Sequence, residues 1–325
     1  MSIIKMRPHL IFIAFFSTLM VVSSFASANW RSDIGVFRIG VVIDASRAGS
    51  LDLLEPFRME IAESLGMDVE FFPARDSINL INALSADRIE YAILSSSGYA
   101  LATVRCACVE PLVIPRSSDS TDGYYLVAIG KRESVRSVEN LLSKQVAALS
   151  ADSIIGEALI RYLLLSNIKN TDLNSLDFQK RPSSEETLTA FTNGEFDVLF
   201  GWSSLSGDPA IGYSRGTLNM IGKSNPAILS ELEIFWRSSQ IPHRPHVIRK
   251  KLPGEAKTIL RDTLVNLFER NPVAYDAIEP HYAGGFTAAR TDRFKTLVDF
   301  IQSYSEPDDA DEAAKNLNSL IPSSQ

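Results

Sequence analysis

The segment VEFFPARDSINLINALSADRIEYAILSSSGYALA, residues 69–102, decides the fold class of this chain. A short apolar stretch is followed by SINLINALSADR (77–88), in which apolar residues recur at helical spacing. A second short apolar stretch, YAILS (91–95), then leads into a hydroxyl-rich turn that begins another helix. Short apolar strands that alternate with helices are typical of mainly parallel sheets covered by helices. We therefore predict an α/β fold.

The same alternation continues over most of the chain. It predicts strands at 37–43, 108–115, 124–131, 145–150, 176–181 and 196–201, and helices at 50–66, 137–142, 184–193, 254–270 and 288–303. The polar stretch RSSDSTDG (116–123) interrupts the pattern and indicates a crossing into a second α/β unit. We expect LNMIGKS (218–224) and EIFWRSSQIPHRPHVIRKKL (233–252) to be strands that return to the first unit.

These segments predict two lobes, each a mainly parallel sheet flanked by helices. We assign residues 29–121 and 216–303 to lobe 1 and residues 122–215 to lobe 2. Residues 304–325 are acidic and poor in aromatic side chains, which favours a flexible or loosely helical tail. Two crossings, near 116–125 and 215–240, suit a hinged clamp that holds its ligand in the cleft between the lobes.

The first residues have the pattern of a secretory signal peptide. Lys5 and Arg7 precede an apolar run at 10–22, and Ala26-Ser27-Ala28 supplies the small-x-small pattern of a cleavage site. The apolar run is too short to span a bilayer as a stable helix. We therefore predict a signal peptide at 1–28, cleavage near Ala28, and a periplasmic protein. The net charge of −7 disfavours nucleic acid as a partner.

The sequence contains no pattern that predicts catalysis, a metal or a cofactor. The chain has four histidines and lacks the G-x-S-x-G and H-E-x-x-H motifs, so it offers no recognisable nucleophile and base. His243 and His246 are three positions apart, but no cysteine or third histidine lies nearby in the sequence. We interpret this pair as part of a solvent-facing crossover strand, and we expect no enzyme, no metal and no cofactor.

The two cysteines, Cys106 and Cys108, are separated by one residue in VRCACVEP. In a strand they would point to the same face, and a disulfide across a single residue would be strained. We therefore expect two small buried side chains rather than a disulfide, although an oxidising compartment leaves the disulfide as the alternative.

Several stretches in order resemble one protein family. Besides 69–102, these are VEPLVIP (109–115), DGYYLVAIGKRESVRSVENLLSKQVAALSADSIIGEALI (122–160), SSEETLTAFTNGEFDVLF (183–200), IPHRPHVIRKKLPGEAKTILRDTLVNL (241–267) and GGFTAARTDRFKTL (284–297). Together they are similar to the type II periplasmic solute-binding proteins of phosphonate, phosphite and phosphate ABC importers. The resemblance extends from about Phe37 to Tyr304. It implies a two-lobed protein that closes on an oxyanion, held partly at the start of a helix in the second lobe.

The resemblance also implies ligand contacts for Ser153, Tyr99 and Glu185. The family turn is rich in hydroxyls, but here Asp152, Ile154 and Ile155 flank Ser153, so the turn is poorly suited to a phosphonate. Ser77 and Ser184 also replace residues usual in the family. The residues themselves suggest further contacts at a second helix start and after a strand: Ser95, Ser96, Ser97 and Trp202. Each of the serines is equally well explained as a helix cap.

The sequence thus favours a periplasmic solute-binding protein that delivers a small ligand to an ABC permease. The alternative is the same clamp acting as a ligand sensor that signals to a membrane receptor or sensor kinase. The ligand class stays open between an oxyanion, such as a phosphonate, phosphate or sulfonate, and a neutral or cationic compound.

Overall fold

The computed structural model describes residues 30–43, 51–132, 134–135, 137–149, 157–167, 175–179 and 181–304. The predicted signal peptide, the predicted tail beyond Tyr304 and the turn around Ser153 lie outside these residues. Within them, every helix is too short or too polar to cross a membrane.

The first of two sheets contains six strands: β1 (Phe37–Val42), β2 (Val69–Ala74), β3 (Tyr91–Ile93), β4 (Val109–Pro115), β11 (His246–Arg249) and β12 (Phe286–Ala288). Their order across the sheet is β12-β4-β11-β3-β1-β2. β1 pairs in parallel with β2 and β3, whereas β11 runs antiparallel to β3 and β4, and β12 runs antiparallel to β4. β1 to β4 therefore form the parallel majority that the sequence predicted.

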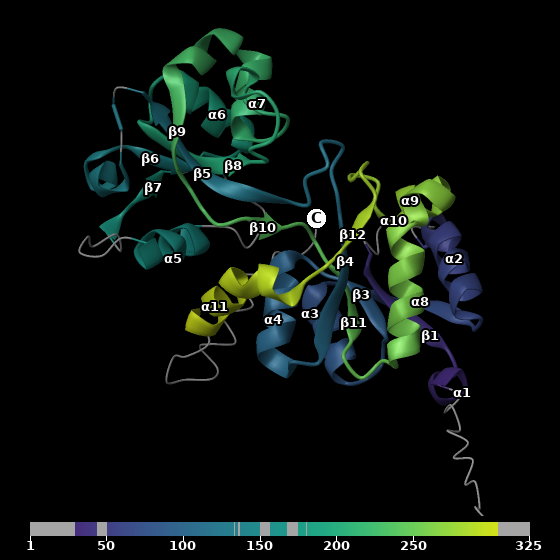
Figure 1. The fold of residues 1–325 in the computed structure, drawn as a ribbon. Coiled ribbons are helices and arrows are strands. Elements are labelled where there is room, and N and C mark those ends of the chain that lie inside the picture. The colour runs from purple at the N-terminus through teal and green to yellow at the C-terminus, as the bar shows by residue number, and fades with distance from the viewer. Residues whose placement is uncertain are drawn as a thin grey trace, which may run out of the picture.

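Helices cover both faces of this sheet (Figure 1). They are α1 (Trp30–Ile34), η1 (Asp52–Leu54), α2 (Glu55–Leu65), α3 (Ser77–Ser85), α4 (Ser96–Cys106), α8 (Gly254–Val265), α9 (Leu267–Arg270), α10 (Pro272–Ile278), η6 (Thr291–Phe294) and α11 (Lys295–Tyr304). One apolar cluster joins the sheet to α2, α8 and α10, and another joins it to α3, α4 and α11. The helix predicted at 288–303 is in fact β12, η6 and α11 in succession.

The second sheet contains β5 (Gly123–Lys131), β6 (Val146–Ala148), β7 (Phe178–Gln179), β8 (Val198–Ser203), β9 (Leu232–Arg237) and β10 (Ile241–Pro242). Its order is β10-β5-β8-β6-β7, and β9 also pairs with β5. β6 is parallel to β7 and β8, and β5 is antiparallel to its three neighbours. The surrounding helices are η2 (Val138–Ser143), α5 (Glu157–Asn167), α6 (Ser184–Thr192), η4 (Pro209–Ile211), α7 (Thr217–Ser224) and η5 (Pro226–Glu231).

The prediction for LNMIGKS (218–224) was wrong, because this segment lies in helix α7. Leu218 and Ile221 are three positions apart and are both buried against the second sheet, which a helix allows and an alternating strand does not. β9 and β10 also pair with the second sheet, so the chain crosses back to the first sheet after Pro242 rather than near residue 215. The lobe boundaries drawn from the sequence remain a prediction.

Local sequence explains how the helices of the first sheet begin and approach the strands. Asp76 caps α3 by accepting a hydrogen bond from Asn79 N at 2.8 Å, and Ser95 caps α4 by accepting from Gly98 N at 3.0 Å. Gly40 lies in β1 directly under α3. A Cβ atom at this position would lie 2.7 Å from Leu80 Cδ2, so the glycine allows the helix to pack closely on the strand.

Cys106 and Cys108 form a disulfide, contrary to our expectation. The prediction placed both residues in one extended strand, but Cys106 is the last residue of α4. Ala107 then adopts the left-handed conformation with φ of 48°, which turns the chain and brings the two Cα atoms within 5.0 Å. The disulfide therefore closes the turn between α4 and β4.

Candidate functional site

A pocket of about 160 Å³ lies where the chain crosses between the two sheets. The first crossing is the loop from β4 to β5, and the second is His243–Pro245, between β10 and β11 (Figure 1). The two crossings bond to each other, since His243 N donates to Asp122 O at 2.9 Å. The pocket is lined by Ser95, Ser96, Ser97, Tyr124, Pro242, His243, Arg244, Tyr282 and Leu297.

The three predicted serines therefore do line a pocket at the start of α4. Ser96 Oγ donates to Pro242 O at 2.6 Å, which ties the start of this helix to the second crossing. Ser95 caps the helix and lies 3.2 Å, Oγ to Oγ, from the buried Ser97. The positive end of the helix dipole faces this space, so the pocket is electrostatically suited to negative charge.

Aromatic rings also line the pocket and form an aromatic wall. The His243 ring lies between Tyr282, at 4.8 Å, and Tyr124, at 6.4 Å, measured between ring centroids. Trp202, on β8, meets Tyr124 edge to face at 6.0 Å, so the predicted Trp202 belongs to this aromatic wall. Burial raises the pKa of both tyrosines, so their hydroxyls stay protonated and can donate hydrogen bonds.

Arg215 supplies a positive charge beside this wall. Its guanidinium carbon lies 5.8 Å from the centroid of the Trp202 ring. Among the described residues, none forms an ion pair with Arg215. The pKa of Asp119 is lowered although burial raises it, because Thr121 donates hydrogen bonds to the carboxylate and Arg215 lies near. The aromatic wall is thus bordered by a cation that has no direct carboxylate partner in the described part of the chain.

Arg244 is also at the pocket, but its charge is compensated. Its Nε donates to Glu279 Oε1 and Oε2 at 2.9 and 3.1 Å. Glu279 Oε1 also lies 2.7 Å from Nε2 of His246, whose Nδ1 bonds the Tyr91 hydroxyl. His246 is fully buried and His243 is 6% exposed, so the expectation of a solvent-facing histidine pair was wrong. The segment passes from the second sheet to the first instead of over the surface.

The structure describes two of the three remaining residues that were predicted to contact the ligand. Tyr99 is 1% exposed and packs 4.7 Å from Phe294, so it belongs to the core of the first lobe and not to the lining of this pocket. Glu185 is exposed in the first turn of α6. Ser153 lies outside the described residues. No group of three histidine, cysteine, aspartate or glutamate side chains in the described part of the chain is arranged to hold a metal.

The sequence reasoning missed Tyr124, Arg215, His243 and Tyr282 as site residues. A local signal existed for Tyr124, which directly follows the polar crossing at 116–123 that the sequence did identify. His243 was singled out as a motif and then placed at the surface. Arg215 and Tyr282 lie in loops without a distinguishing pattern, and tertiary structure alone brings them near the cleft.

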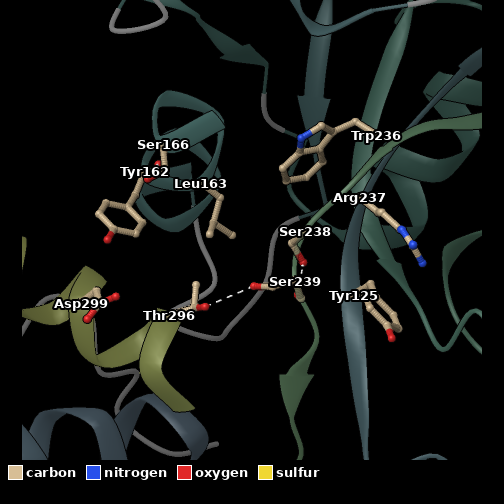
Figure 2. Close-up of a pocket in the computed structure, with 10 residues that line it drawn as sticks. All are labelled: Tyr125, Tyr162, Leu163, Ser166, Trp236, Arg237, Ser238, Ser239, Thr296 and Asp299. Carbon is tan, nitrogen blue, oxygen red and sulfur yellow. Dashed lines mark hydrogen bonds between the residues drawn. The ribbon is translucent and has the colours of Figure 1, made fainter. Parts of the chain in front are cut away.

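A larger pocket of about 710 Å³ adjoins the segment between β9 and β10. Figure 2 shows Leu163 of α5 on the side toward Trp236, and Tyr162 of the same helix above Asp299 of α11. Ser239 Oγ lies 3.2 Å from Thr296 Oγ1 and links this segment to α11. We assign this pocket no ligand.

Two α/β lobes joined by two crossings, with a polar and aromatic pocket at the junction, define a type II periplasmic binding protein. The chain belongs to the family of periplasmic substrate-binding proteins of phosphonate ABC transporters, whose family model matches residues 39–294. Members of this family bind a solute in the periplasm and pass it to an ABC transporter. The family assignment confirms the main functional prediction.

The chain is also similar to individual known proteins. The phosphonates-binding periplasmic protein of Escherichia coli (strain K12) is 22% identical over 261 residues, which cover 78% of this chain and 72% of that protein. A Xanthomonas citri protein solved with bound ATP matches with a TM-score of 0.53 at 16% identity, covering 87% of this chain and 98% of that chain. Transferrin 1 from Manduca sexta matches with a TM-score of 0.54 at 12% identity, covering 90% of this chain and 49% of that chain. The two structures show a shared fold.

Proposed function

We propose that this protein captures a small phosphonate-type oxyanion in the pocket between its lobes, after export through a cleaved signal peptide. The observation that carries the proposal is Arg215, a cation beside the aromatic side chains of the pocket that has no ion-pair partner among the described residues. The start of α4 adds favourable electrostatics on the facing lobe. The name of the Escherichia coli relative and the family description support a phosphonate.

Capture would use contacts from both lobes. Ser95, Ser96 and Ser97 line the pocket from the first sheet and Tyr124 from the second, with Trp202 against Tyr124 and Arg215 near Trp202. Ser153 and Glu185 remain candidates on the second lobe. A ligand that touches both walls favours the closed state, since it makes more contacts there than in the open state.

Isothermal titration with methylphosphonate tests the proposal. We expect saturable binding and, at a concentration one hundred times the dissociation constant, a stabilisation of about 2.7 kcal/mol in thermal unfolding. Arg215→Gln should weaken binding roughly tenfold to a hundredfold, because a charge-assisted hydrogen bond is lost. The matched control is Arg290→Gln, which removes an exposed arginine paired with Asp292 and should leave affinity unchanged. Equal affinity of wild type and Arg215→Gln would overturn the proposal.

A further inference from the structure

His243 occupies an unusual position, because it is a buried imidazole on the short segment that joins the two lobes. Its backbone N–H donates to Asp122 O at 2.9 Å, so the two crossings hold it from both sides. Its ring lies between Tyr124 and Tyr282 and lines the small pocket. The side chain is therefore fixed in orientation before any ligand arrives.

The hydrogen bond of Nδ1 fixes which nitrogen carries the proton. Nδ1 lies 3.0 Å from Pro115 O. A carbonyl oxygen can only accept, so Nδ1 must carry the hydrogen and donate it. In the neutral ring, Nε2 then has a free lone pair and acts as a hydrogen-bond acceptor.

Nε2 has no hydrogen-bond partner among the described residues, in contrast to Nδ1. It is also not one of the fully buried polar atoms that lack a partner in the described part of the chain. Since the ring lines the pocket, Nε2 is open to the pocket space. The structure therefore presents an unpaired acceptor to whatever the pocket holds.

The surroundings keep this ring neutral. Burial lowers the pKa of His243, and the charge of Arg215 lowers it further; the hydrogen bond to Pro115 O and the charges of Asp122 and Asp119 raise the pKa but are outweighed. Asp122 is already engaged by Arg293, whose Nη2 donates to it at 2.8 Å. The net effect is an acceptor located in a cleft that otherwise offers positive charge and hydrogen-bond donors.

We infer that His243 is a specificity-determining residue that selects an oxyanion carrying a proton over one of the same shape without a proton. A P–OH group donates to Nε2, while the charged oxygens face the donors of the pocket. A sulfonate or sulfate directs an oxygen lone pair at the Nε2 lone pair and leaves the acceptor unpaired, which is unfavourable in a buried site. The inference rests on the proposed function and adds the protonation state of the ligand to it.

Two pairs of isosteric probes test this inference by titration calorimetry at neutral pH, where a large share of each phosphorus oxyanion keeps a proton and the lowered pKa of His243 favours its neutral ring. The pairs are methylphosphonate with methanesulfonate, and inorganic phosphate with sulfate. We expect wild type to prefer the phosphorus member of each pair by about tenfold or more, which is the usual effect of one unmade buried hydrogen bond. If both pairs show this preference, the protein recognises the proton on the oxyanion and not the methyl group, which only the first pair carries.

Two variants separate the role of Nε2 from the structural role of Nδ1. In His243→Asn, the shorter amide side chain can still donate to Pro115 O but has no group at the Nε2 position. The ratio of the affinities for the phosphorus and sulfur members of each pair should therefore fall toward one. His243→Gln places an amide oxygen near the Nε2 position and should keep part of the preference. Thermal unfolding without ligand checks that both variants are folded, and Arg215→Gln should weaken both members of each pair alike.

The outcomes distinguish the two hypotheses. If wild type binds neither member of either pair, the proposed function fails. If wild type binds both members with equal affinity, or if folded His243→Asn keeps the full preference, oxyanion binding stands and the assignment of His243 is overturned.

Discussion

Glu279 Oε1 lies 2.7 Å from His246 Nε2, and neither side chain is more than 1% exposed. Nδ1 of the same ring bonds the Tyr91 hydroxyl, so neutral His246 accepts from Tyr91 and donates to Glu279. Glu279 in turn holds Arg244, on the crossing between the lobes. A buried network thus connects the core of the first sheet to the wall of the pocket.

This network predicts that the protein is less stable in mild acid. Burial lowers the pKa of His246, so the unfolded chain binds a proton that the folded chain excludes. The contribution of His246 to the free energy of unfolding is fully present above the pKa of histidine in the unfolded chain, about 6.5. It is lost as the pH falls below that value. The free energy of unfolding, measured in urea between pH 7.5 and about 5, should therefore fall.

The pKa of Glu279 is lowered too, since His246 and Arg244 outweigh the effect of burial, and this adds a further loss at more acidic pH. His246→Gln keeps a donor toward Glu279 and removes the titration, so its stability should depend less on pH near 6. Some dependence should remain, because burial also lowers the pKa of His243. A wild type whose stability is constant or rises as the pH falls would contradict this prediction.

Removing Glu279 should destabilise the protein strongly. Glu279→Ala leaves the buried His246 N–H without its acceptor, which costs about 1–3 kcal/mol, and it also removes the counter-charge of the partly exposed Arg244. Urea unfolding at pH 7.5 measures the loss. Asp292→Ala is the control, because its ion pair with Arg290 is exposed and exposed pairs contribute little. Similar effects of the two substitutions would refute the importance of the network.

The disulfide should be present in the purified protein and contribute modestly to stability. Cys106 and Cys108 enclose a very short loop, and the entropic gain from closing such a loop is about 1–2 kcal/mol. Titration of the unfolded, unreduced chain should detect no free thiol. The double variant Cys106→Ser with Cys108→Ser should fold and lose about that stability. Detection of two free thiols in protein purified without a reductant would show that the disulfide is absent.

Tyr99 and Trp202 were both predicted to contact the ligand, and the structure predicts opposite results for them. Tyr99→Phe should leave the affinity for methylphosphonate unchanged, because the side chain is buried against Phe294. Trp202→Ala should weaken binding, because Trp202 supports Tyr124 and lies beside Arg215. Calorimetry compares the two variants. The assignment fails if Tyr99→Phe impairs binding and Trp202→Ala does not.

The exported protein should begin at Asn29. The small residues Ala26 and Ala28 fit the cleavage site of signal peptidase after Ala28. Mass spectrometry of protein released from the periplasm determines the new N-terminus. Recovery of the intact chain, with Met1 and the apolar run still present, would argue against cleavage.

The sequence by itself determined the α/β class, most of the strands and helices, and the family. These features depend on patterns within about ten residues, such as the apolar spacing of α3 or the serine cap of α4, and such patterns can be recognised locally. The sequence also identified the family through its resemblance, which the match over residues 39–294 confirmed.

The prediction from a local sequence pattern was wrong where that pattern is compatible with two different local structures. The four residues LNMI at 218–221 suit either a strand or a helix, and packing on the second sheet selected the helix. Cys106 and Cys108 suit a disulfide only because Ala107 turns the chain at the end of α4. The outcome in each case depended on contacts that the segment itself does not contain.

Tertiary structure alone decided what lies at the pocket. Tyr91 and His246 are 155 positions apart, and Asp122 and Arg293 are 171 apart, yet each pair is hydrogen-bonded. Burial lowers the pKa of His246, and the hydrogen bond to Pro115 O sets the tautomer of His243; both depend on contacts between distant parts of the chain. The chemistry of the pocket is therefore a property of the assembled fold, since it depends on distances that no sequence spacing specifies.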